Sequence, residues 1–116
     1  MRPPHPYEEE KLETWDLASL EVEPHHPQVL HSEDEGRAIA INLPAGEELQ
    51  EHETHEHAYL MVAAGEIEFE QGSQTVTGRP GFLAHFEPHE RRVLRAKADS
   101  RLLLILTPYP APGRQS

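Results

Sequence analysis

The segment AYLMVAAGEIEFEQGSQ, residues 58–74, decides the fold class. It opens with a seven-residue apolar run that ends at Gly65 and is short enough for a strand covered on both faces. Residues 66–70 then alternate strictly, so that their acids face water while Ile67 and Phe69 face a core. The sequence 71–74, Gln-Gly-Ser-Gln, is typical of a hairpin turn. The segment therefore predicts β-strands joined by tight turns.

The same pattern continues on both sides of this segment. Residues 37–43 alternate, with Ile39, Ile41 and Leu43 on one face. Further short strands are predicted at 75–77, 82–86, 92–96 and 101–107, with turns at 44–46, 78–81 and 98–100. No amphipathic helix separates these strands, which excludes a βαβ fold. We therefore expect an all-β protein, a small antiparallel β-barrel or jelly roll.

The length of 116 residues fits one domain. We expect three parts: an N-terminal arm (1–36), the barrel (37–107) and a proline-rich tail (108–116). The arm is acidic and rich in proline, but it carries enough apolar residues to pack on the barrel or on a partner.

Composition argues against several functions. The net charge of −11, with ten Lys and Arg that form no stripe, disfavours nucleic-acid binding. No apolar run approaches the 18 residues of a membrane span, and the N-terminus lacks the apolar core of a signal peptide, so we expect a cytoplasmic protein without membrane contact. Glycine-rich nucleotide motifs do not occur, and no nucleotide cofactor is expected. Cysteine is absent, so any metal must bind histidine, carboxylate or water. The nine histidines stand out, because histidine is the commonest metal ligand.

Two stretches resemble the conserved motifs of the cupin family. Gly46, five residues, His52 and the later Gly65 are similar to the first cupin motif. Pro80-Gly81, followed by a strand that leads to Phe86-Glu87-Pro88, looks like the second. The resemblance spans about residues 37–107 and implies a small single-domain cupin that forms a homodimer. It does not imply one activity, because cupins include enzymes, ligand sensors and storage proteins.

The positions that bind metal in cupins are only partly kept. In cupins that bind metal, the first motif supplies two histidines and an acid, and the second motif supplies a third histidine. These positions fall on His52, Thr54, Ala58 and Arg92 in this chain. Two interpretations stay open: a one-residue shift or bulge lets nearby histidines replace the missing ligands, or the usual site is absent.

The candidate metal ligands are His52, His57 and His89. The further candidates are His55, Tyr59 and Arg92. We expect these side chains to converge on an internal pocket, where imidazoles suit Zn, Fe, Ni, Mn or Cu. An inward Arg92 would suit a carboxylate or phosphate instead. By strand parity, His85 and Glu87 lie outside the barrel if Phe86 fills it.

The function predicted from these residues is binding of a divalent transition metal and a small polar molecule, with or without catalysis. Two alternatives stay open: a metal-free ligand-binding or sensor protein, and a structural dimerisation domain. The sequence leaves the substrate, the reaction and the metal undetermined.

Overall fold

The computed structural model describes residues 12–51 and 54–112, which form nine β-strands and no helix. The strands are β1 (Gln28–Glu33), β2 (Gly36–Leu43), β3 (Glu48–Glu51), β4 (His57–Ala64), β5 (Ile67–Gln71), β6 (Gln74–Gly78), β7 (Leu83–Phe86), β8 (Arg92–Ala96) and β9 (Ser100–Thr107). Within these ranges no helix has the length and hydropathy needed to cross a membrane.

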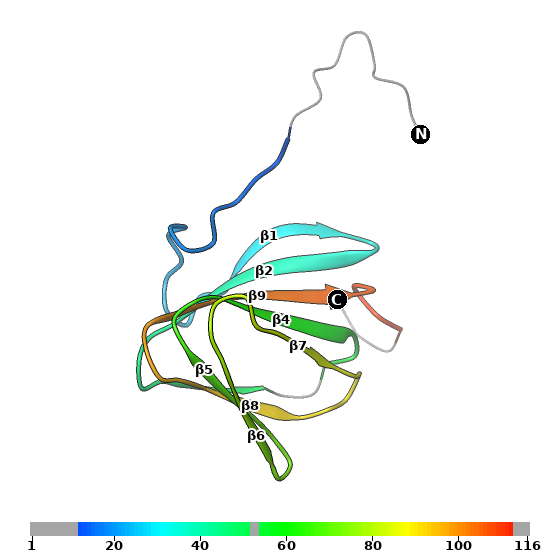
Figure 1. The fold of residues 1–116 in the computed structure, drawn as a ribbon. Coiled ribbons are helices and arrows are strands. Elements are labelled where there is room, and N and C mark those ends of the chain that lie inside the picture. Colours follow the sequence, from blue (N-terminus) through cyan, green and yellow to red (C-terminus); the bar gives the residue numbers. More distant parts are fainter. Residues whose placement is uncertain (1–11, 52–53, 113–116) are drawn as a thin grey trace, which may run out of the picture.

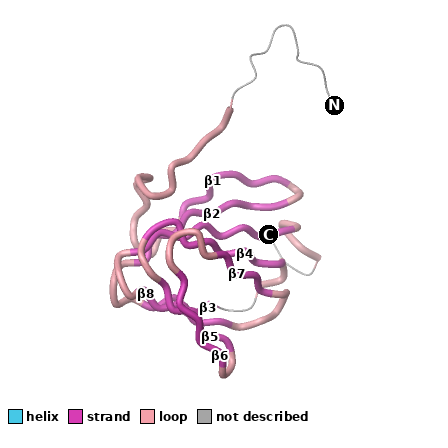
Figure 2. Tube along the Cα trace, in the orientation of Figure 1, coloured by secondary structure: helices cyan, strands magenta, loops and turns pink. Residues whose placement is uncertain are grey.

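The strands form two antiparallel sheets that pack against each other (Figure 1). The first sheet has the order β1-β2-β9-β4-β7, and the second has the order β3-β8-β5-β6. The loops that join the strands are short for the most part, and the β5–β6 hairpin projects from the body of the barrel (Figure 2). The prediction of an all-β antiparallel barrel is confirmed.

The core lies between the inner faces of the two sheets. Ala58, Leu60 and Val62 of β4 are 0 %, 1 % and 0 % exposed, so alternate residues of this strand point inward. The other sheet contributes Ile67 and Phe69, the inward residues predicted from the alternation in 66–70. The other buried members of the cluster are Ile41, Leu43, Phe86, Leu94, Ala96, Leu102, Leu104 and Leu106.

Two strands were not predicted, and both lie at sheet edges. β1 falls in the segment that we expected to be part of the arm, and it pairs with β2 along the edge of the first sheet. β3 pairs with β8 at the edge of the second sheet. Edge strands bury little apolar surface and tolerate charged residues, so their sequences carry a weak periodic signal.

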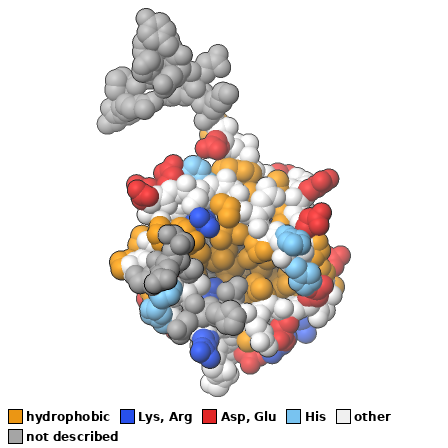
Figure 3. Space-filling model, turned by 180° about the vertical axis from the view of Figure 1, so that it is seen from behind, with side chains coloured by type: hydrophobic (Ala, Val, Ile, Leu, Met, Phe, Trp, Pro, Cys, Tyr) orange, Lys and Arg blue, Asp and Glu red, His pale blue; other side chains and the backbone are white. Residues whose placement is uncertain are grey.

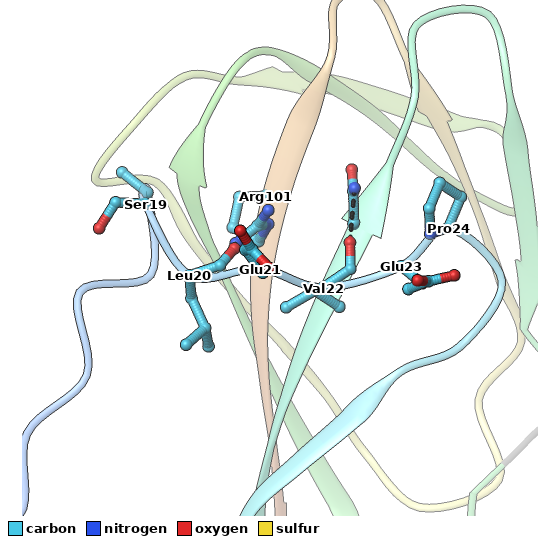
Figure 4. Close-up of a pocket in the computed structure, with 9 residues that line it drawn as sticks. Ser19, Leu20, Glu21, Val22, Glu23, Pro24 and Arg101 are labelled. Atoms are coloured by element: carbon cyan, nitrogen blue, oxygen red, sulfur yellow. Dashed lines mark hydrogen bonds between the residues drawn. The ribbon is translucent and has the colours of Figure 1, made fainter.

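The segment before β1 packs on the outer face of the first sheet. The guanidinium of Arg101 donates hydrogen bonds to the carbonyl oxygens of Leu17, at 2.7 Å, and of Leu20. The Asn42 amide donates to the carbonyl oxygen of Val22 at 2.8 Å, and Val22 is 7 % exposed. Figure 4 shows this segment crossing β9 and β2 with Arg101 directed at it. The two polar side chains thus hold the segment on the barrel.

The outer face of the second sheet is a network of opposite charges. Arg95 of β8 contacts Glu70 at 2.6 Å, Glu48 at 2.8 Å and Glu68 at 3.4 Å. The hydrogen bond with Glu70 is the main reason that the pKa of Arg95 is raised, and the hydrogen bond with Glu48 raises it further.

Seen from behind, the molecule shows hydrophobic side chains gathered in the middle of the face and acids mostly around it (Figure 3).

Shortening Leu60 tests this core. Leu60→Ala should lower the free energy of unfolding by about 2–5 kcal/mol, because the lost methyl groups leave a cavity in packed surroundings. Leu12→Ala makes the same chemical change at a side chain that is 88 % exposed, and should cost less than about 0.5 kcal/mol. Urea denaturation measures both, and equal costs would contradict the packing described.

Candidate metal site on the outer face of the sheet

The candidate site lies where β4 and β7 pair on the outer face of the first sheet. The register sets Ala58 opposite Phe86 and Tyr59 opposite His85. Ala58 and Phe86 are buried in the core. Because neighbouring residues of a strand point to opposite faces, His57, Tyr59 and His85 point outward.

His57, His85 and Glu87 form a compact group on this face. Each offers one ligand atom, and the three atoms lie within 4.8 Å of one another. The Nδ1 of His57 lies 3.0 Å from the Nε2 of His85 and 3.5 Å from a carboxylate oxygen of Glu87. The two imidazole rings stack, with centroids 5.2 Å apart and planes at 17°. The ring of Tyr59 contacts that of His85, with centroids 4.8 Å apart and planes tilted by 37°.

This arrangement supplies the donor set of a transition-metal site. Two imidazole nitrogens and one carboxylate oxygen suit zinc and its neighbours, and three protein ligands leave positions for water or another molecule. The side chain of His57 is 41 % exposed and that of Glu87 is 62 % exposed, so the group is open to solvent. The protein therefore has a His-His-Glu group that could hold a metal ion, with no preference for one metal fixed by the geometry.

The candidates predicted from the sequence are dispersed. His57 belongs to the group, and Tyr59 stands beside it, but both lie on the outer face instead of in the expected internal pocket. The reason is that Ala58 and Leu60 are the residues of β4 that fill the core. His52 lies outside the described residues.

His55 and His89 meet each other at a different place. Their rings make an edge contact, with centroids 5.1 Å apart and planes at 83°. His89 has a φ of 69°, and its backbone N–H donates to the carbonyl oxygen of Thr54 at 2.7 Å. Among the described residues, neither histidine belongs to a group of three potential ligands.

His85 and Glu87 were not among the predicted ligands. Strand parity already placed them outside the barrel if Phe86 fills it, and Phe86 is 5 % exposed. The missing information was that β7 pairs with β4, which brings His57 to the same face. Pairing of strands separated by a hairpin is a long-range property that the local pattern does not contain.

Solved structures show which fold this is. A cupin superfamily protein from Desulfitobacterium hafniense has 18 % identity and a TM-score of 0.73, with 84 % of this chain and 93 % of that one covered. An RmlC-like cupin from Desulfovibrio desulfuricans has 19 % identity and a TM-score of 0.73, covering 84 % and 98 %. A protein with a double-stranded β-helix domain from Klebsiella pneumoniae has 17 % identity and a TM-score of 0.74, covering 88 % and 94 %. The chain has the cupin fold. No protein-family model matches it, and no curated protein is similar in sequence.

The interior of this cupin barrel does not carry the usual metal ligands at its described positions. Thr54, Ala58 and Arg92 stand at three of the four positions that the family motifs indicate, and they are 9 %, 0 % and 2 % exposed. The guanidinium of Arg92 lies over the ring of Phe86, 4.8 Å from its centroid, so Arg92 points inward. A guanidinium has no lone pair to donate and repels a cation. These residues therefore do not fit the metal set of metal-binding cupins.

Glu56 is the other buried ionisable residue near this end of the barrel. Its side chain is 0 % exposed, and one carboxylate oxygen accepts a hydrogen bond from the backbone N–H of Ala111 at 3.1 Å. The hydroxyl of Thr54 donates to the carbonyl oxygen of Glu56 at 2.9 Å. Glu56 thus links the start of β4 to the segment that follows β9.

Removal of the Glu56 carboxylate should destabilise the fold. Glu56→Ala leaves the buried N–H of Ala111 without its acceptor, and we expect a loss of about 1–3 kcal/mol in the free energy of unfolding. Glu87→Ala removes an exposed carboxylate and should cost less than about 0.5 kcal/mol. Denaturation of both variants without metal measures the difference. A larger cost for Glu87→Ala would contradict the structural role of Glu56.

Proposed function

We propose that this protein binds a divalent transition metal ion through His57, His85 and Glu87. The observation that carries the proposal is the convergence of three ligand atoms within 4.8 Å on one sheet face. The cupin fold by itself does not support the proposal, because three of the four interior positions indicated by the family motifs hold Thr54, Ala58 and Arg92 instead of ligands.

The strands make this group more than a chance contact of surface histidines. The backbone of His57 pairs with Thr107 of β9, and from Ala58 onward β4 also pairs with β7, where His85 lies opposite Tyr59. Ligands held on paired strands need little ordering when the ion binds, and this favours affinity. The tilted contact with the ring of Tyr59 also limits the rotation of His85.

A bound ion would give the site its chemistry. It would act as a Lewis acid toward an oxygen of a small polar molecule in an open coordination position. His57, His85 and Glu87 would hold the ion. Zn, Fe, Ni, Mn and Cu all accept this donor set.

Metal analysis tests the proposal directly. Untagged protein, purified without a nickel column, should carry or take up close to one equivalent of Zn²⁺ in titration calorimetry at pH 7.5. His57→Ala and His85→Ala should each weaken binding on the order of tenfold to a hundredfold, because each removes one of three ligands.

His31→Ala provides the matched control. His31 is also a surface histidine beside a glutamate, with its Nε2 2.8 Å from a carboxylate oxygen of Glu33, but it belongs to no three-ligand group in the described ranges. This variant should bind Zn²⁺ as the wild type does. Full zinc occupancy in His57→Ala and His85→Ala would reject the site.

The same face supports the proposal of a homodimer. Tyr59, Leu83 and Ile105 are 37 %, 60 % and 36 % exposed, although each is large and hydrophobic. Tyr59 pairs with Ile105 across β4 and β9, and Leu83 pairs with Met61 across β7 and β4, so the three lie on neighbouring strands. Contiguous exposed apolar side chains of this kind are typical of association surfaces. A second copy of the chain on this face would remove them from water.

A charge on this face should separate the two copies. Ile105→Glu should convert a dimer to a monomer at about 10 μM in sedimentation velocity, because a buried unpaired carboxylate is costly. Val76→Glu introduces the same charge at a side chain that is 43 % exposed on the other sheet, and should leave the dimer intact. A wild-type protein that sediments only as a monomer would refute the dimer and leave the metal proposal standing.

A further inference from the structure

A cavity lies where the open edges of the two sheets face each other. It has a volume of about 220 Å³ and opens between the β5–β6 hairpin and β7. Its lining consists of Phe69, Gln71, Gln74, Val76, Phe82, Ala84, His85 and Phe86.

The cavity is open because two sheet edges meet there without pairing. β6 is the last strand of the second sheet, and β7 is the last strand of the first. Residues 74–77 of β6 are exposed, and Val76 remains 43 % exposed although its side chain borders the cavity. The two edges thus form the sides of an accessible cleft.

The inner part of the cleft is aromatic. The rings of Phe69 and Phe82 are 5.4 Å apart between centroids and tilted by 35°. Phe86 completes the lining and is 5 % exposed, so it is fixed in the core. Fixed phenyl rings favour a flat apolar body that can stack on their faces or meet their edges.

The part of the cleft toward the hairpin turn is polar but uncharged. Phe69 pairs with Val76, and one step nearer the turn on the same face Gln71 pairs with Gln74. Each glutamine amide offers two donors and an acceptor oxygen. Among the described residues, the lining holds no Asp, Glu, Lys or Arg, and His85 is its ionisable side chain. The lining therefore changes from aromatic rings in the inner part of the cleft to side-chain amides near the hairpin turn.

We propose that this cleft binds a small, uncharged planar ring that carries an amide-type edge. The ring would lie against Phe69, Phe82 and Phe86, and its polar edge would exchange hydrogen bonds with Gln71 and Gln74. The volume is below the roughly 300 Å³ at which pockets for drug-sized ligands begin, so one or two fused rings fit. His85 lines this cleft and also belongs to the proposed metal group, but binding of the ring needs no ion.

Benzamide is the probe for this site. Full-length protein treated with EDTA is titrated with benzamide and followed by ¹⁵N-correlated NMR. The side-chain amide signals of Gln71 and Gln74 should shift in a saturable way. Benzoate, which has the same ring with a charge, should bind on the order of tenfold more weakly, because the described part of the lining holds no Lys or Arg to pair with a carboxylate.

Two tryptophan substitutions on one strand make a matched pair. Val76→Trp should fill the cleft and weaken benzamide binding on the order of tenfold or more, a change of about 1.4 kcal/mol. Thr75→Trp introduces the same ring on the opposite face of β6, where Thr75 is exposed, and should leave binding within about twofold. Absence of shifts at Gln71 and Gln74 up to solubility would overturn the proposal. The proposal would also be overturned if Val76→Trp bound benzamide as tightly as the wild type does, or if benzoate bound more tightly than benzamide.

Discussion

The pairing of β4 with two neighbours is the constraint on which the rest of the structure depends. β4 pairs with β9 on one side and with β7 on the other, and its residues Ala58, Leu60 and Val62 are almost completely buried. A shift of one residue would exchange the faces and place His57 and Tyr59 in the core. The apolar face therefore fixes the register, and the register fixes which face the histidines occupy.

This constraint places the group of potential metal ligands on the outer face of the barrel, whereas metal-binding cupins carry their ligands inside. Three of the four interior positions that hold metal ligands in the family carry Thr54, Ala58 and an inward Arg92, whose guanidinium lies over Phe86, and the fourth, His52, lies outside the described residues. A fold does not determine the location of its site, because different faces of the same barrel can carry ligands. In this chain the convergent imidazoles belong to the outer face, next to exposed hydrophobic residues.

Sequence reasoning predicted the fold well, because it depends on local alternation. The segment 66–70 indicated the inward Ile67 and Phe69, and both are buried. β1 and β3 were missed, since edge strands need little apolar surface. The site was predicted less well. His57 was named, whereas His85 and Glu87 were not, because their proximity to His57 depends on the pairing of β4 with β7. Such long-range pairing leaves no trace in local spacing.

The central claim concerns where a metal ion binds, and anomalous scattering tests it most directly. Data are collected at the zinc absorption edge from a crystal of untagged protein grown with Zn²⁺. We expect one strong peak between the Nδ1 of His57, the Nε2 of His85 and the carboxylate of Glu87, on the outer face of the sheet. A peak inside the barrel beside Arg92, with none at this group, would contradict it.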